Sequence, residues 1–132
     1  MKLGQVLLVE GDPNDYEFIM SALQDVGVLD VQHVPSLPFE LKVLSQQSAL
    51  PPPHVIVLGE YVDTKTAHGM LNASDSKEKL MDITIMILFT TMFPQDITFL
   101  KKQKIVEMYQ KPYSYTGYIE IAQNIKHRLH LQ

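Results

Sequence analysis

The chain has no cysteine, and its 132 residues contain no long hydrophobic run. Without thiols there is no disulfide and no thiolate metal site, and their absence fits a reducing compartment. A membrane-spanning helix needs about 18 consecutive, mainly apolar residues, and no segment approaches that length. The first residues, Met1–Gly4, also lack the charged and apolar regions of a signal peptide. These absences predict a cytoplasmic protein with no membrane association.

Positive charge is scarce as well, because 11 Lys and Arg face 15 Asp and Glu, for a net charge of −4. This balance argues against nucleic acid as a partner. There are no internal repeats, linkers or low-complexity tracts, and 45% hydrophobic content is ordinary for a globular protein. We therefore predict a single domain spanning residues 1–132, with no output domain attached.

Short aliphatic runs alternate with amphipathic segments along the chain. Unbroken runs are typical of parallel strands buried on both faces, whereas runs with polar residues suit sheet edges. The unbroken runs are Val6–Val9, 54–58 and 83–89, and the two with polar residues are 28–34 and 105–109. Helices are predicted over 13–26, between Pro35 and Pro51, weakly over 65–79, from Pro94 and from Ser114. Five strands alternating with five helices predict an α/β fold with a parallel sheet.

The segment Gln5–Asp15, QVLLVEGDPND, joins the first strand to the first helix. Glu10 ends the aliphatic run, Asp12 offers a side-chain oxygen to cap the helix, and Pro13 suits the first helical position. In an open α/β sheet, ligands bind at such carboxyl ends of strands. The helix is predicted to turn one apolar stripe to the core, with Gly27 as its left-handed cap. That stripe comprises Phe18, Ile19, Ala22, Leu23 and Val26.

The predicted strand ends carry Glu10, Thr90 and Lys111, and Lys111 is followed by a proline. This order of strands, acids and helices, with Lys-Pro after the fifth strand, resembles the response regulator receiver domain of two-component systems. The resemblance covers essentially the whole chain. It implies a flavodoxin-like three-layer α/β/α fold with a five-stranded parallel sheet of order 2-1-3-4-5. Right-handed crossovers then place the first and fifth helices on one face and the other three on the opposite face.

In that family, an aspartate after the third strand accepts a phosphoryl group from a histidine kinase, and an acid pair after the first strand helps to hold Mg²⁺. A hydroxyl and a lysine bind the phosphoryl oxygens. Glu10, Thr90 and Lys111 match, but the second acid is Gly11 and the phosphoacceptor position is Gly59. Glycine offers no carboxylate for an acyl phosphate or for the metal. The resemblance therefore implies a pseudo-receiver: a non-enzyme with a vestigial pocket, no cofactor, and weak or absent Mg²⁺ binding.

Two alternatives stay open. Glu60 or Asp63 could replace the missing aspartate and give an active receiver. We disfavour this because Glu60 would project to the opposite side of an extended chain, and a nucleophile must be placed closely. A flavodoxin-like cofactor-binding protein is the other alternative, but the acidic stretch from Glu10 to Asp15 would repel a phosphate group.

Four of the six tyrosines lie between Tyr109 and Tyr118. Tyr118 is predicted to be core, whereas tyrosines near a helix start suit a protein interface. In receivers the fourth helix, fifth strand and fifth helix form the usual partner surface. We call the corresponding residues the aromatic face and weigh an interface equally with core packing: Phe93, Phe99, Tyr109, Tyr113 and Tyr115. The expected partner is a histidine kinase or another signalling protein, with a homodimer through this face as an alternative.

A glycine at position 59 would leave the Lys111 ammonium without its nearest counter-charge. A partly buried ammonium must find another partner or lose its charge. The candidates are Glu10 and a free anion bound by Lys111, Thr90 and loop N–H groups. We predict Glu10, because its carboxylate is tethered and has no metal to bind.

Overall fold

The computed structural model describes residues 5–34, 54–59, 84–90, 94–102 and 106–130, with the backbone alone at 99, 100 and 106. The helices predicted after Pro35 and over 65–79 lie outside these ranges, as do Glu60, Asp63 and Phe93. No helix within the described ranges is long and apolar enough to cross a membrane.

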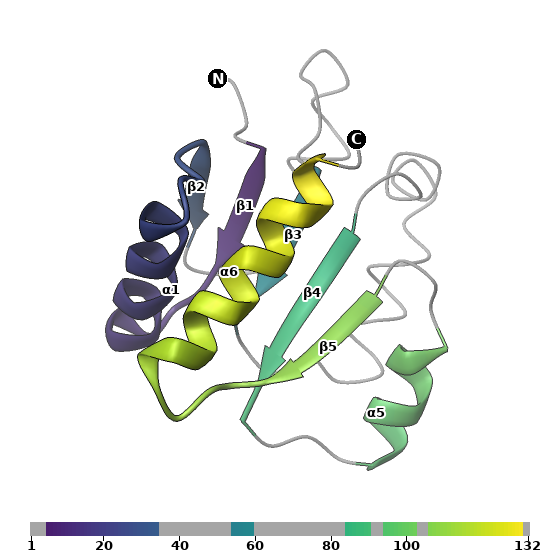
Figure 1. Cartoon of the computed structure of the whole chain (residues 1–132). Helices are drawn as coiled ribbons and strands as arrows, with labels where there is room; N and C mark the ends of the chain where they lie inside the picture. Colours follow the sequence, from purple (N-terminus) through teal and green to yellow (C-terminus); the bar gives the residue numbers. More distant parts are fainter. Residues whose placement is uncertain (1–4, 35–53, 60–83, 91–93, 103–105, 131–132) are drawn as a thin grey trace.

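Five parallel strands form one sheet of order β2-β1-β3-β4-β5 (Figure 1). They are β1 (Val6–Val9), β2 (Val31–Val34), β3 (Val55–Leu58), β4 (Thr84–Phe89) and β5 (Val106–Gln110). In this register Val9 lies opposite both Val34 and Leu58, so β1, β2 and β3 end at the same level. The predicted sheet order is confirmed, and the two strands with polar residues are indeed its edges.

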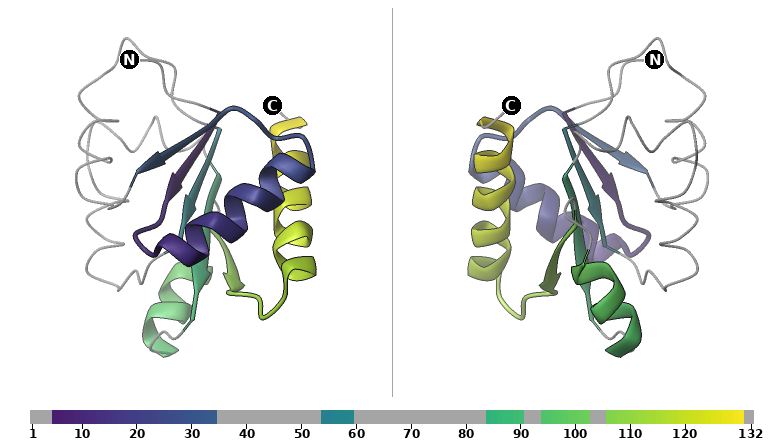
Figure 2. Two further views of the ribbon diagram at one scale, coloured as in Figure 1. Left: turned by 90° about the vertical axis from the view of Figure 1, so that its left-hand side faces the viewer. Right: turned by 90° about the vertical axis from the view of Figure 1, so that its right-hand side faces the viewer.

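Three helices are described: α1 (Pro13–Asp25), α5 (Pro94–Lys101) and α6 (Tyr115–His130). Helices α1 and α6 contact each other on one face of the sheet, whereas α5 lies beside β5 on the opposite face (Figure 2). Within the described residues, this is the predicted division of the first, fourth and fifth helices. It places the start of α1 and the start of α6 at the carboxyl ends of the strands (Figure 1).

The central strands are buried on both faces, which explains their unbroken aliphatic sequences. Alternate residues of these strands face α1 and α6, and the others face the opposite layer. The strands contribute Val6, Leu8, Val55, Val57, Met86 and Leu88 to the hydrophobic core on this face. From the helices, this core receives Ile19, Ala22, Leu23, Tyr118, Ile121, Ala122 and Ile125. Burial of this apolar surface is the main term that holds the helices on the sheet.

Two local predictions are wrong. Phe18, expected in the core stripe, is 47% exposed and instead stacks on Tyr118 at a ring-centroid distance of 5.6 Å. It lies about 100° around the helix from the buried Ile19, so the stripe that reaches the sheet is narrower than its apolar residues suggest. Strand β2 begins at Val31 rather than at residue 28. The chain leaves Gly27 in the predicted left-handed conformation, φ 88°, and uses the next residues to reach the sheet.

Candidate functional site

Four of the predicted site residues directly follow strands that end at one edge of the sheet, and one of these is Thr90, after β4. Glu10 follows β1, Gly59 follows β3 and Lys111 follows β5. The Gly59 N–H donates to the Val9 carbonyl at 2.8 Å, and the Lys111 N–H donates to the Phe89 carbonyl at 2.8 Å. Because these bonds extend the parallel ladders by one residue, the backbone fixes where each functional side chain starts.

The start of α1 places a further carboxylate beside this edge. Asp12 is the predicted N-cap, since its Oδ1 accepts from the Asn14 N–H at 2.9 Å and from the Asp15 N–H at 3.1 Å. Pro13 takes the first helical position. The turn brings Asp15, in the first turn of the helix, within reach of Lys111.

Lys111 is bound by two carboxylates. Its Nζ lies 3.1 Å from Glu10 Oε1 and 2.7 Å from Asp15 Oδ2. Burial is the largest single influence and lowers the pKa of Lys111. The hydrogen bonds and charges of Asp15 and Glu10 together outweigh it and raise the pKa above its ordinary value. The predicted pairing with Glu10 is confirmed. Asp15 was missed, although an acid in the first turn of a helix that starts at this edge was the available signal.

The Glu10 carboxylate fills the space directly over Gly59. A Cβ atom placed on Gly59 would lie 2.2 Å from Glu10 Oε1 and 2.7 Å from its Cδ. Glu10 Oε2 accepts from the Asp12 N–H at 3.2 Å, and the residue is only 5% exposed. We call Glu10, Asp15, Gly59 and Lys111 the strand-end cluster. Within it, the carboxylate of Glu10 lies where a side chain at position 59 would begin.

The other predicted pocket residues are not part of this cluster. Thr90 follows β4 with an exposed side chain, and no described contact joins it to Lys111. Gly11 is exposed in the turn between Glu10 and Asp12. The described ranges contain no group of three or more His, Asp or Glu side chains arranged to hold a metal. Both Glu10 oxygens already have protein partners, so the residues present do not fit the Mg²⁺ of an active receiver.

The aromatic face is described in part. Tyr113 is 98% exposed and Tyr115 is 39% exposed, whereas Tyr118 is buried, as predicted. Tyr115 donates its O–H to the carboxylate of Asp25, which joins α6 to the end of α1. Phe93 lies outside the described residues, and only the backbone of Phe99 is described.

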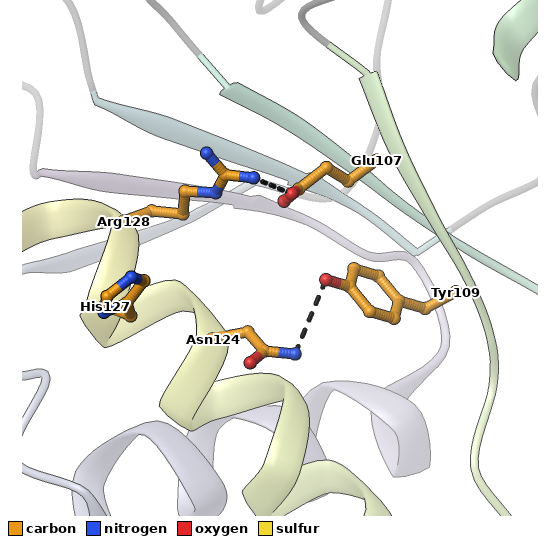
Figure 3. Close-up of a pocket in the computed structure, with 5 residues that line it drawn as sticks. All are labelled: Glu107, Tyr109, Asn124, His127 and Arg128. Carbon is orange, nitrogen blue, oxygen red and sulfur yellow. Dashed lines mark hydrogen bonds and ion pairs between the residues drawn. The ribbon is translucent and has the colours of Figure 1, made fainter. Parts of the chain in front are cut away.

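A recess between β5 and α6 contains the fourth tyrosine of this region (Figure 3). Its volume is about 240 Å³, and it is lined by Glu107, Tyr109, Asn124, His127 and Arg128. Arg128 forms an ion pair with Glu107, and Asn124 donates to the Tyr109 hydroxyl at 3.4 Å. Burial, followed by the negative charge of Glu107, raises the pKa of Tyr109. We call this the β5–α6 recess.

Comparison with known protein families and with curated proteins finds no match for the sequence. Solved structures do match. The phosphorylated cyanobacterial phytochrome response regulator RcpA has a TM-score of 0.68 at 23% identity, over 92% of this chain and 89% of RcpA. A receiver domain of a histidine kinase from Syntrophus aciditrophicus gives 0.68 at 20%, over 96% and 90%. The Vibrio cholerae chemotaxis protein CheY4 gives 0.64 at 18%, over 91% and 96%.

These likenesses establish the fold. The chain has the three-layer architecture of response regulator receiver domains, as its sequence predicted.

Proposed function

We propose that this chain is a receiver-like signalling module of the two-component type that has lost phosphotransfer and acts by binding a protein partner. The observation that carries the proposal is the end of β3, where Gly59 lies under the carboxylate of Glu10. The receiver fold and the Lys-Pro after β5 support the signalling class. The glycine removes the nucleophile that phosphotransfer needs at this place.

The contacts of Lys111 support the same conclusion. In a receiver this lysine binds the phosphoryl group, but here its ammonium is already bound by two tethered carboxylates. An incoming anion would have to displace one of them and would meet the negative charge of the other. The strand-end cluster therefore offers no nucleophile and no free cation for phosphotransfer.

Partner binding is assigned to the surface formed by β5, α6 and the loop between them. Tyr113 projects almost completely into solvent, and tyrosine supplies large contact area at low entropy cost. The β5–α6 recess lies on the same two elements. The kind of partner that fits the two-component class is a histidine kinase or another signalling protein, and a second copy of this chain is the alternative.

Incubation with acetyl phosphate and Mg²⁺, followed by intact-mass measurement, tests the loss of phosphotransfer. We expect an unchanged mass. A stable gain of one phosphoryl group that disappears in Glu60→Gln or Asp63→Asn would instead identify an active receiver with a substitute acceptor.

A capture experiment with native cell extract tests the binding role. We expect a partner whose recovery is unaffected by acetyl phosphate and Mg²⁺ and is reduced by Tyr113→Ala. A recovery that follows the phosphate donor would contradict the proposal. Flavin absorbance in the purified protein would support the flavodoxin-like alternative.

A further inference from the structure

Glu10 has the contacts of a bound ligand. One carboxylate oxygen accepts from the Lys111 ammonium at 3.1 Å, and the other accepts from the backbone N–H of Asp12 at 3.2 Å. The group is nearly excluded from solvent, with 5% exposure of the residue. A cation, a backbone donor and an enclosed space are the features that proteins use to bind small anions.

The space itself depends on Gly59. Since a Cβ atom there would lie 2.2 Å from Glu10 Oε1, a longer residue at position 59 and the present position of Glu10 exclude each other. The end of β3 therefore has space for one carboxylate, and the side chain of Glu10 occupies that space.

We propose that the end of β3 is a binding site for a small carboxylate whose resident ligand is the side chain of Glu10. Tethering gives this carboxylate a high effective concentration, so free anions do not compete with it. This inference rests on the proposed function. In a receiver-like site without its aspartate, the bound Glu10 carboxylate would hold the site in one state.

Asp15 has a different role in the same cluster. Its carboxylate also binds Lys111, but it is 30% exposed and lies at the open side of the cluster. When Glu10 is truncated, the Lys111–Asp15 pair is expected to stay in place and to form one wall of the vacated space. Truncation of Asp15 itself should leave a gap that is open to water.

Chemical rescue of Glu10→Ala tests the site. The variant should melt at a lower temperature than the parent chain, and sodium formate should restore most of the lost Tm with a saturable dose dependence. Sodium chloride at the same ionic strength should not. The parent chain should gain no more from formate than from chloride, because its site is already filled.

Two matched variants separate a binding site from a general salt effect. Glu10→Gln keeps the shape of the side chain and fills the space, so formate should not rescue it. Asp15→Ala removes the other carboxylate without enclosing a cavity, so formate and chloride should act equally on it. Rescue of all three variants, or of none, would overturn the proposal.

If Glu10→Ala does not fold in sodium chloride, the variant is refolded in sodium formate and its unfolding transition is measured in both salts. A cooperative transition that appears in formate alone supports the site, and no transition in either salt overturns it. No phosphate donor or partner enters these measurements. A failed rescue therefore leaves the loss of phosphotransfer untouched, whereas a mass gain with acetyl phosphate would contradict only the proposed function.

Discussion

The strand-end cluster and the β5–α6 recess each pair a basic side chain with an acid, yet they differ in burial. The side chains of Lys111 and Glu10 are 16% and 5% exposed, whereas those of Arg128 and Glu107 are 40% and 25% exposed. A buried charge that loses its partner is costly, but an exposed one is solvated by water. The comparison predicts that the ion pair of the cluster contributes more to the stability of the fold than the ion pair of the recess does.

Their positions in the fold explain the difference. Lys111 follows β5 and reaches across the sheet edge to the start of α1, where α1 and the neighbouring strand ends enclose it. Arg128 lies in the last turn of α6, beside β5, which is an edge strand of the sheet that the described residues form. The same type of ion pair is thus enclosed in one region and only partly buried in the other.

Removing the cation from each region should give the largest contrast. Lys111→Met should lower the free energy of unfolding by about 3 kcal/mol, because it leaves the Glu10 carboxylate buried without its counter-ion. Arg128→Met should cost less, about 1 kcal/mol, because the guanidinium is 40% exposed although one Glu107 oxygen is buried. Urea unfolding of both variants measures the two losses. Equal losses would show that burial does not distinguish the regions.

Filling the space over Gly59 should have the next largest effect. Gly59→Ala should cost about 1–3 kcal/mol, the range typical of overpacking, because its Cβ atom must displace a carboxylate held by two hydrogen bonds. The same substitution in a Glu10→Ala background should cost much less. The double-mutant cycle by urea unfolding gives the coupling. Additive costs would mean that Glu10 does not occupy the space.

The sequence predicted the sheet from strand patterns together with a family resemblance, and it predicted one pair of the cluster from charge pairing. Unbroken aliphatic runs predicted the buried parallel strands, and the resemblance to receiver domains implied their order. Together they placed Glu10, Gly59 and Lys111 at a common edge. The filled space over Gly59 could not be predicted, because it depends on the direction of the Glu10 side chain. The predicted burial of Phe18 was wrong for a related reason. Apolar spacing identifies the helix face that is buried, but the width of the buried stripe depends on what packs against it.

The sequence analysis did not predict the β5–α6 recess. Tyr109 was predicted as part of a partner face, but its neighbours Asn124, His127 and Arg128 come from α6, and nothing in the sequence sets the separation of β5 and α6. Asp15 was missed because its contact with Lys111 depends on how the first turn of α1 is oriented at the edge of the sheet, which the sequence pattern does not specify.

A smaller effect should follow from pH. The raised pKa of Lys111 means that its ion pairs stabilise the fold fully below the ordinary value of 10.5, and this contribution is lost as the pH rises through the folded-state pKa. The difference in stability between the parent chain and Lys111→Met should be constant from neutral pH to about pH 10 and should shrink above 10.5. Tyr109, whose raised pKa has no contribution from Lys111, is present in both proteins and cancels in the difference. The charge of Lys111 lowers the pKa of Tyr118, so both proteins are compared in a Tyr118→Phe background. A difference that grows above pH 10.5 would contradict this sign.

The smallest effect on stability is expected at Tyr113. Its side chain is 98% exposed and packs against little, so Tyr113→Ala should change the free energy of unfolding by less than about 0.5 kcal/mol. If the aromatic face binds a partner, the same substitution should still weaken capture by about tenfold or more, as expected for a truncated aromatic anchor. Glu17→Ala, at an exposed position on α1, is the matched control and should change neither quantity. A Tyr113→Ala variant that melts normally and captures its partner normally would exclude Tyr113 from the interface. Because this variant leaves the strand-end cluster intact, it separates binding from stability within one fold.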